Sequence, residues 1–376
     1  MKTFAMRQPT ISLSRKEGWV AFANKPKLEP PEPVTRSALI GLSDAAAADY
    51  AAQRLRYLSW LTIATPQLSR VHAAMDDMIN SDLQDFDRVR SAPVIDAEPG
   101  VGKSTAVNVF GREIHREIIA KEGPMVGGEA ERIPVVRIGL TGNTTPKSLL
   151  VQILDFYGHP RRSGTTLEVS SSALDCALRC ETELIIIDDI HFLNLNRRDG
   201  REVSNTLKSL ANDFPATFIF VGVGVEARGL FDEGLGPYES AAAQLGRRWT
   251  RLEMPAFHIF TERQRNEWRT TLKELERGMI LVDAHPGMIA DELSDYFFAR
   301  TSGYIGSMME LARIGAYKAI KDGSEQITRE LLDTVQISRA AEKRRYELEA
   351  AMKSGKLHSL PKQSKHRKPG DVDDDS

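Results

Sequence analysis

The sequence predicts an α/β fold in which a parallel sheet is flanked by helices and followed by a small C-terminal helical domain. Short apolar runs alternate with helical stretches between residues 91 and 224, which is typical of parallel strands joined by crossover helices. A glycine-rich loop directly follows the first of these runs. Beyond Met254 the apolar runs stop and helical periodicity continues alone, which indicates a separate helical domain.

Composition excludes several classes of protein. The chain has 376 residues, with 50 Lys and Arg against 52 Asp and Glu, and a formal net charge of −2. This balance excludes a strongly basic, histone-like protein but allows a local basic patch. Two cysteines are too few for a disulfide-framed secreted fold. We see neither a signal-peptide core nor an apolar stretch of about 18 residues, so we expect a cytoplasmic protein with no membrane partner.

The first part of the chain precedes the sheet. We expect residues 1–43 to form an irregular arm, because a proline-rich stretch inside it is incompatible with a helix. Ser43 or Asp44 then caps an alanine-rich helix, and a second helix begins at Thr65, which is followed by proline. We assign residues 44–258 to one domain that contains these two lead-in helices and the sheet.

Four apolar runs in this domain are predicted strands. They cover residues 91–96, 133–140, 183–193 and 216–224. The helices expected between them cover residues 103–119, 146–158, 167–180 and roughly 200–213. Because each strand is separated from the next by a helix, the strands are expected to run parallel.

The remainder of the chain is expected to be a helical lid domain and a tail. The lid domain covers residues 259–350, with helices over 261–283, 288–301, 303–322 and 328–350. Residues 351–376 are expected to be disordered. They carry six Lys or Arg and no acid between Lys353 and Gly370, and then an acidic end, DVDDDS.

The loop after the first strand carries the most specific motif, AEPGVGKST at residues 97–105. It fits the phosphate-binding pattern G-x-x-x-x-G-K-[ST], except that Ala97 occupies the first glycine position. Glycines let successive amides point at phosphate oxygens, the lysine reaches the β- and γ-phosphates, and the serine hydroxyl ligates Mg²⁺. We therefore predict a nucleotide site with Mg²⁺ formed by Glu98, Pro99, Gly100, Val101, Gly102, Lys103, Ser104 and Thr105.

A strand that ends in two acids supplies the second half of this site. The stretch IIIDDIH covers residues 185–191 and would place a carboxylate beside the phosphate loop. Magnesium prefers such oxygen ligands, so Asp188 is the predicted metal ligand. Asp189 would polarise the water that attacks the γ-phosphate.

Two arginines follow the predicted strands. The stretch LGRRW contains Arg247 and Arg248. An arginine there would reach the γ-phosphate of a neighbouring subunit and stabilise the charge that develops in the transition state. The alternative is that both are ordinary surface charges.

The ordered set of these stretches resembles the AAA+ ATPases of transposition modules, the TniB family, which is related to the transposition regulator TnsC. The resemblance covers about residues 60–335. Besides the phosphate loop, it rests on WLTIATPQLSRVHAAMDDM, IPVVRIGLTGNTTPKSLLVQIL, LIIIDDIHFL, SNTLKSLANDFPATFIFVGVGVEA, LGRRWTRLEMPAF and TSGYIGSMMELARIGAYKAI. It implies an AAA+ P-loop NTPase fold with a C-terminal lid.

The resemblance implies an ATP-dependent regulator of DNA transposition. Such a protein assembles on DNA in its ATP state as a ring or filament, and recruits or activates an integrase-type transposase at the target. Lys103 and Ser104 would hold phosphate and Mg²⁺, Asp188 would be the Walker B acid, and Arg247 or Arg248 would complete the neighbour's site. DNA contacts would be mainly to the phosphates.

Three positions depart from the family pattern. Asp189 stands where the family more often has glutamate, Val223 where a polar sensor residue is expected, and Gly306 where many lids carry an arginine. Together they predict slow ATP hydrolysis, which suits a timing switch.

Two alternative functions remain open. A replication initiator or helicase loader shares the fold and would carry a DNA-reading module after the lid, for which residues 323–350 are too few. A nucleotide-gated protein adaptor with little hydrolysis would bind no DNA with any nucleotide.

Overall fold

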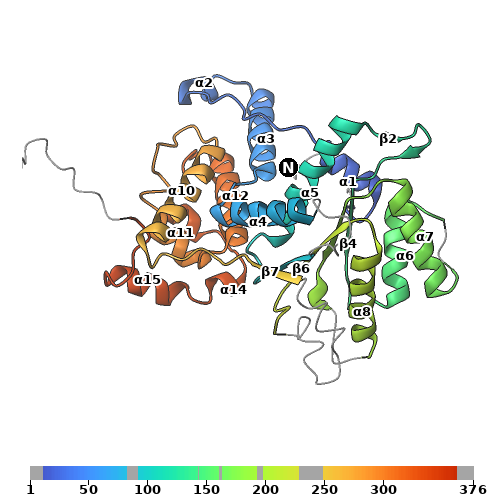
Figure 1. Cartoon of the computed structure of the whole chain (residues 1–376). Coiled ribbons are helices and arrows are strands. Elements are labelled where there is room, and N and C mark those ends of the chain that lie inside the picture. The colour runs from blue at the N-terminus through green and yellow to red at the C-terminus, as the bar shows by residue number, and fades with distance from the viewer. Residues whose placement is uncertain are drawn as a thin grey trace, which may run out of the picture. The chain divides into compact units, whose positions relative to one another are not determined.

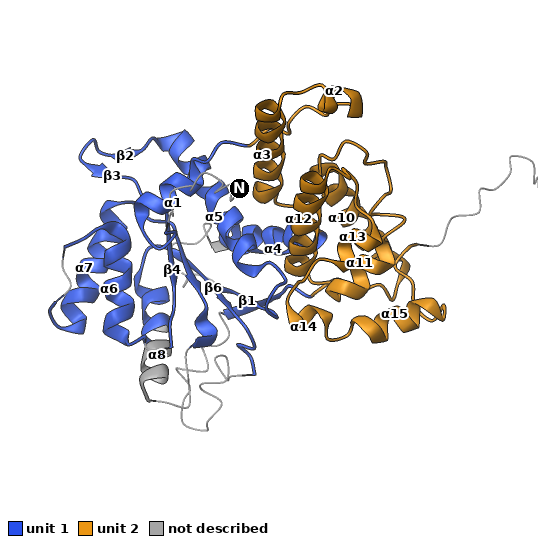
Figure 2. Cartoon of the chain, turned by 180° about the vertical axis from the view of Figure 1, so that it is seen from behind, with its two compact units in different colours: residues 1–27, 66–255 blue, residues 28–65, 256–376 orange. Residues whose placement is uncertain are grey.

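The computed structural model describes residues 12–82, 92–142, 144–160, 163–192, 198–227 and 249–361. The chain divides into two compact units (Figure 2). Unit 1 comprises residues 1–27 and 66–255, and unit 2 comprises residues 28–65 and 256–376. The chain therefore starts in unit 1, passes into unit 2, returns to unit 1 and ends in unit 2. The first lead-in helix, which we grouped with the sheet, belongs to unit 2.

Unit 1 contains a five-stranded sheet in the order β4-β5-β6-β1-β7. The strands are β1 (Ala92–Asp96), β4 (Val135–Gly139), β5 (Leu184–Asp188), β6 (Thr217–Gly222) and β7 (Trp249–Glu253). All neighbouring strands are parallel. The residues of β1, β5 and β6 are buried throughout, as expected for strands covered on both faces. The predicted parallel sheet is confirmed.

Helices of unit 1 flank this sheet (Figure 1). They are α1 (Lys16–Ala23), α4 (Pro66–Asp82), α5 (Lys103–Glu122), α6 (Pro146–Tyr157), α7 (Thr166–Arg179) and α8 (Arg198–Asp213). Helix α5 packs on β4, β5 and β6, and both α1 and α4 pack on α5. Helix α6 packs on β4, α7 and α8. A short hairpin of β2 (Met125–Val126) and β3 (Ala130–Glu131) was not predicted.

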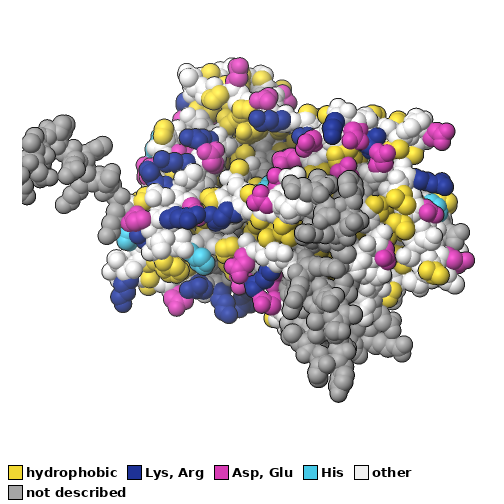
Figure 3. Space-filling view, in the orientation of Figure 1, with side chains coloured by type: hydrophobic (Ala, Val, Ile, Leu, Met, Phe, Trp, Pro, Cys, Tyr) yellow, Lys and Arg dark blue, Asp and Glu magenta, His cyan; other side chains and the backbone are white. Residues whose placement is uncertain are grey.

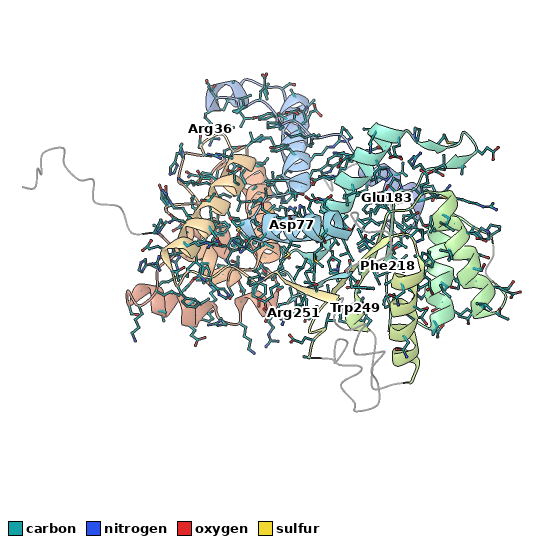
Figure 4. The ribbon with its side chains drawn as sticks, in the orientation of Figure 1. Arg36, Asp77, Glu183, Phe218, Trp249 and Arg251 are labelled. Atoms are coloured by element: carbon teal, nitrogen blue, oxygen red, sulfur yellow. The ribbon has the colours of Figure 1, made fainter. Side chains whose placement is uncertain are left out.

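The edge strand β7 was also not predicted. Its residues are half-buried or exposed, so it contains no apolar run. It is held by parallel pairing with β1 and by the indole of Trp249, which stacks on Phe220 with ring centroids 4.5 Å apart. Figure 4 labels Trp249 and Arg251 on this strand. Arg247 and Arg248 therefore precede the last strand in the sequence instead of following the sheet, and both lie outside the described residues.

The N-terminal arm is not irregular throughout, so this prediction was wrong. Helix α1 buries Trp19 completely against Gly111 of α5, where a Cβ would lie 3.1 Å from the indole. Arg116 donates to the carbonyls of Ala23 and Lys25 at the end of α1, at 2.5 Å each. The proline-rich stretch separates α1 from α2 (Arg36–Ile40) without preventing either helix.

Unit 2 is helical in its described residues. Besides α2 it contains α3 (Asp44–Trp60), α10 (Glu262–Gly278), α11 (Ser294–Thr301), α12 (Ile305–Asp322), α13 (Arg329–Asp333), α14 (Arg339–Glu342) and α15 (Arg345–Lys353). The helix predicted over 288–301 is shorter than expected. The helix predicted over 328–350 is broken into three, because Ser338 caps a new helix within it. None of the described helices is both long and apolar enough to span a bilayer.

The tail begins later than predicted. Helix α15 continues to Lys353, and Ser359 is buried, donating its amide and its hydroxyl to Asp295 at 2.7 Å and 2.6 Å. Residues 351–361 are therefore part of unit 2. Residues 362–376 lie outside the described residues.

A buried ion pair explains why α3 belongs to unit 2. Arg54 of α3 donates to both carboxylate oxygens of Glu325, at 2.6 Å and 3.0 Å, and both side chains are 2% exposed. Glu325 also accepts the amide of Val282 at 3.2 Å. These long-range contacts fasten α3 to the segment that follows α12.

Breaking this pair is expected to destabilise unit 2. Arg54→Met leaves a buried carboxylate without its cation, which costs about 3–5 kcal/mol. The double variant Arg54→Met/Glu325→Leu should recover most of that loss, because no buried charge remains. Urea unfolding of both variants measures the effect, with Arg56→Met on the exposed face of α3 as the control. If Arg54→Met lowers the free energy of unfolding by less than about 1 kcal/mol, the Arg54–Glu325 pair does not act as a buried ion pair.

Candidate functional site

The sheet order brings distant segments of the sequence to one edge of the sheet, the edge at which the carboxyl ends of the parallel strands lie. Strand β6 lies between β1 and β5, and the register pairs Asp96, the last residue of β1, with Gly222. Strand β5 ends at Asp188 on the same edge, because the strands are parallel. The loop of residues 97–105 leaves β1 there. The structure thus places the predicted loop and the acid pair at the same edge of the sheet.

The loop has the backbone of an anion-binding turn. Gly100 and Gly102 have φ of +83° and +94°, a conformation that glycine adopts without penalty. Ala97 does not have a positive φ, so the methyl group at the first glycine position is tolerated. Val101 is buried and anchors the loop. Helix α5 begins at Lys103, and the amides of its first turn have no acceptor within the helix.

Lys103 is held by the loop itself. Its Nζ donates to the carbonyl of Glu98 at 2.7 Å. Burial lowers the pKa of Lys103, and the negative charges of Asp188 and Asp189 oppose that shift. The ammonium group is therefore surrounded by a backbone carbonyl and nearby carboxylates, and a bound phosphate would be its natural partner.

Asp188 is buried and already paired. Its carboxylate accepts Arg137 Nη2 at 2.7 Å and the amide of Asp189 at 2.9 Å. Arg137 lies on β4, next to β5 in the sheet, where Gly139 is in register with Asp188. Sequence analysis missed Arg137, although one charged residue inside the apolar run IPVVRIGL was a usable signal. Arg137 balances the charge of the predicted metal ligand.

Asp189 has an unusual backbone and a perturbed carboxyl group. Its φ is +64°, which costs a non-glycine residue roughly 1 kcal/mol. Burial, together with the negative charge of Asp188, raises the pKa of Asp189. The Nδ1 atom of His191 lies 3.9 Å from its Oδ1 atom. The carboxyl group is therefore more basic than an exposed aspartate.

The end of β6 lies beside the end of β1 and is tightly packed. A Cβ on Gly222 would lie 2.6 Å from Val225 and 2.8 Å from Ile190, so only glycine fits. Asp96 is buried beside it. Its carboxylate accepts the amide of Glu226 at 3.1 Å and lies 3.8 Å from Nε of Arg251. Sequence analysis missed Asp96, because its role depends on the loop that follows β6.

These residues fit a triphosphate with Mg²⁺. Several hydrogen-bond donors for phosphate oxygens gather here. They come from the loop with the positive-φ glycines, the free amides of the first helical turn and Lys103. The hydroxyl of Ser104 and the carboxylate of Asp188 are the hard oxygen ligands that Mg²⁺ prefers. When bound, Mg²⁺ would neutralise charge on the phosphates. The paired arginines Arg247 and Arg248 lie outside the described residues.

Comparisons with known proteins agree with this geometry. The profile of a family described as "AAA domain" matches residues 87–231. The structure of the Aeropyrum pernix ORC2 protein with ADPNP and ADP is 16% identical with a TM-score of 0.53, covering 82% of this chain and 85% of that chain. The Aeropyrum pernix ORC1 protein in complex with DNA is 16% identical with a TM-score of 0.51, covering 85% and 69%. Cdc6p from Pyrobaculum aerophilum is 14% identical with a TM-score of 0.51, covering 73% and 68%. No curated protein sequence matches the chain.

At this level of identity the similarity establishes the fold. The chain has an AAA+ P-loop NTPase fold, with the five-stranded parallel sheet, flanking helices and a helical C-terminal region. The comparisons support the AAA+ class and do not extend to the transposition-regulator subfamily that the sequence resembles.

Replacing Arg137 is expected to favour a divalent cation at Asp188. Arg137→Gln removes the guanidinium that neutralises this carboxylate, so the Mg²⁺ concentration that half-saturates nucleotide binding should fall on the order of tenfold. Titration of Mg²⁺ with a fluorescent ATP analogue measures this. Arg179→Gln, an exposed position on α7, is the matched control. An unchanged or higher Mg²⁺ requirement would argue against competition at Asp188.

Proposed function

We propose that this chain is an ATPase that binds ATP with Mg²⁺ at residues 98–105 and uses the bound state to assemble on DNA. The observation that carries this proposal is the meeting of the positive-φ glycines, Lys103 and the Asp188–Asp189 pair at one edge of the sheet. Elsewhere in the described residues we find no comparable grouping of anion-binding amides with paired carboxylates.

Each residue has a distinct role in the proposed reaction. Lys103 and the loop amides bind the phosphates, and Ser104 and Asp188 would hold Mg²⁺. Asp189 orients the attacking water and accepts its proton as the oxygen bonds to the γ-phosphorus and ADP departs. Arg247 or Arg248 of an adjacent copy would stabilise the charge on the transferred phosphoryl group. ATP would then join neighbouring subunits, and hydrolysis would separate them.

The short Asp189 side chain is consistent with slow turnover. Asp189→Asn cannot accept a proton, so hydrolysis should fall by about 100-fold or more while nucleotide binding persists. Because burial raises the pKa of Asp189, the wild-type rate should fall as the pH drops through that raised pKa, where the carboxyl becomes protonated. Single-turnover hydrolysis measured across pH tests both statements. A pH profile that is the same in Asp189→Asn and wild type would rule out Asp189 as the base.

The finer proposal is that the chain regulates DNA transposition. Its support is the ordered resemblance over about residues 60–335 to the TniB family. The partners would be DNA, a transposase and further copies of the chain in a ring or filament. After α12, the described residues of unit 2 form three short helices, and no winged DNA-reading module is found among them.

A replication initiator is the second candidate. One observation favours it: the three similar structures described above are ORC and Cdc6 proteins, and one of them is in complex with DNA. An initiator would select a defined DNA sequence, whereas a transposition regulator of this kind would bind DNA mainly through its phosphates. Comparing origin-like and random duplexes separates the two.

Nucleotide-controlled DNA binding tests the proposal. We expect a long fluorescent duplex to be bound, with growth in particle size by light scattering, when a slowly hydrolysed ATP analogue is present. ADP or no nucleotide should give little binding, and Lys103→Ala should abolish the response, because the lysine no longer binds the β- and γ-phosphates. ATP binding without DNA binding in any nucleotide state would overturn this function and favour the protein adaptor.

A further inference from the structure

We propose that the turn between α14 and α15 binds the phosphate backbone of duplex DNA. The surface consists of Arg339, Lys343, Arg344 and Tyr346, and we call it the basic turn. This inference rests on the proposed function, that the chain binds DNA, and adds where unit 2 contacts it. The basic turn lies outside the nucleotide site and within one compact unit.

The turn lies on an ordered part of unit 2, which we call the platform and which is held together by buried hydrogen bonds of Arg300. Arg300 of α11 is 1% exposed and donates to Glu342 at 2.5 Å, which holds the end of α14. The same guanidinium donates to the carbonyls of Leu332 and Val335, at 2.8 Å and 2.7 Å. These bonds fix the last residue of α14 and the segment that precedes this helix, so the side chains of the turn project from an ordered backbone.

Acidic residues of this region are used for internal contacts. Arg345 donates to Asp333 at 2.5 Å and to Glu349 at 3.1 Å, which secures the start of α15. The ring of Tyr296 lies beneath the guanidinium of Arg345, 5.6 Å from its centroid. Asp333, Glu342 and Glu349 therefore neutralise arginines that hold the platform and do not neutralise the basic turn.

The bases of the turn face solvent instead. Arg339, Lys343 and Arg344 are exposed, and Figure 3 shows Lys and Arg side chains gathered over α14. Within the described part of the chain, the ion pair found for these three is that of Arg344 with Glu347, at 3.8 Å. Both side chains of that pair are largely exposed, so it contributes little. The turn consequently carries positive charge without an effective counter-charge.

The chemistry of the turn favours nucleic acid over protein. Between residues 339 and 368 the sequence has ten Lys or Arg against three Glu, a run that suits a repeating polyanion. Tyr346 is 82% exposed and is the one large exposed aromatic or apolar side chain in described residues 324–361. A protein interface needs a larger apolar centre, whereas DNA interfaces are polar and positively charged. A tyrosine hydroxyl can donate to a phosphate oxygen.

A double substitution tests the inference in the full chain. Lys343→Gln/Arg344→Gln should weaken binding of a fluorescent 60-bp random duplex by about tenfold or more at ~0.1 M salt, and lower the salt slope by about two. The matched control, Arg263→Gln/Arg277→Gln, removes two exposed charges from α10 of the same unit. It should leave affinity and slope unchanged. Affinity for a slowly hydrolysed ATP analogue, present throughout, reports that each variant is folded.

The outcomes separate this inference from the proposed function. Wild-type chain that binds no DNA with any nucleotide overturns both. Two outcomes overturn only the proposal for the basic turn. In the first, Lys343→Gln/Arg344→Gln binds DNA as strongly as the wild type; in the second, the control variant is weakened as much as the double variant. As a second measurement, a photo-crosslinking analogue replaces Tyr346 or, as a control, the exposed Tyr317 of α12. Crosslinking to DNA from position 346 and not from 317 supports the inference, and the reverse contradicts it.

Discussion

The parallel pairing of β1, β6 and β5 determines where the candidate site residues of this chain meet. Parallel strands end at the same edge, so the loop after β1 and the acids after β5 must meet there. Crossover helices are required between such strands, and one of them, α5, begins with the amides that we propose bind phosphate. The proposed nucleotide site therefore depends on strand order as much as on the residues that form it.

Charge at this edge is balanced within the chain. The buried acids Asp188 and Asp96 are matched by Arg137 and Arg251, which come from strands β4 and β7 on either side. For Asp188 to hold Mg²⁺ as proposed, its ion pair with Arg137 would have to open.

Local patterns predicted the parts of the fold that depend on local physics. The apolar runs predicted β1, β5 and β6, because strands buried on both faces are mostly apolar, and they predicted β4, whose run is interrupted only by Arg137. Strand β7 was missed, since an edge strand that is half exposed has no such run. Arg137 and the placement of α3 were missed because they depend on register and on the Arg54–Glu325 pair, which join residues far apart in the sequence. The roles of Arg247 and Arg248 stay predictions.

Calorimetric titration with a slowly hydrolysed ATP analogue tests the proposal that this edge of the sheet is an ATP–Mg²⁺ site. We expect saturable binding of one nucleotide per chain in the presence of Mg²⁺, with much weaker binding when the metal is chelated. Lys103→Ala and Asp188→Asn should each remove the metal-dependent part. Absence of nucleotide binding to the folded wild-type chain, or binding unaffected by both substitutions, would contradict it.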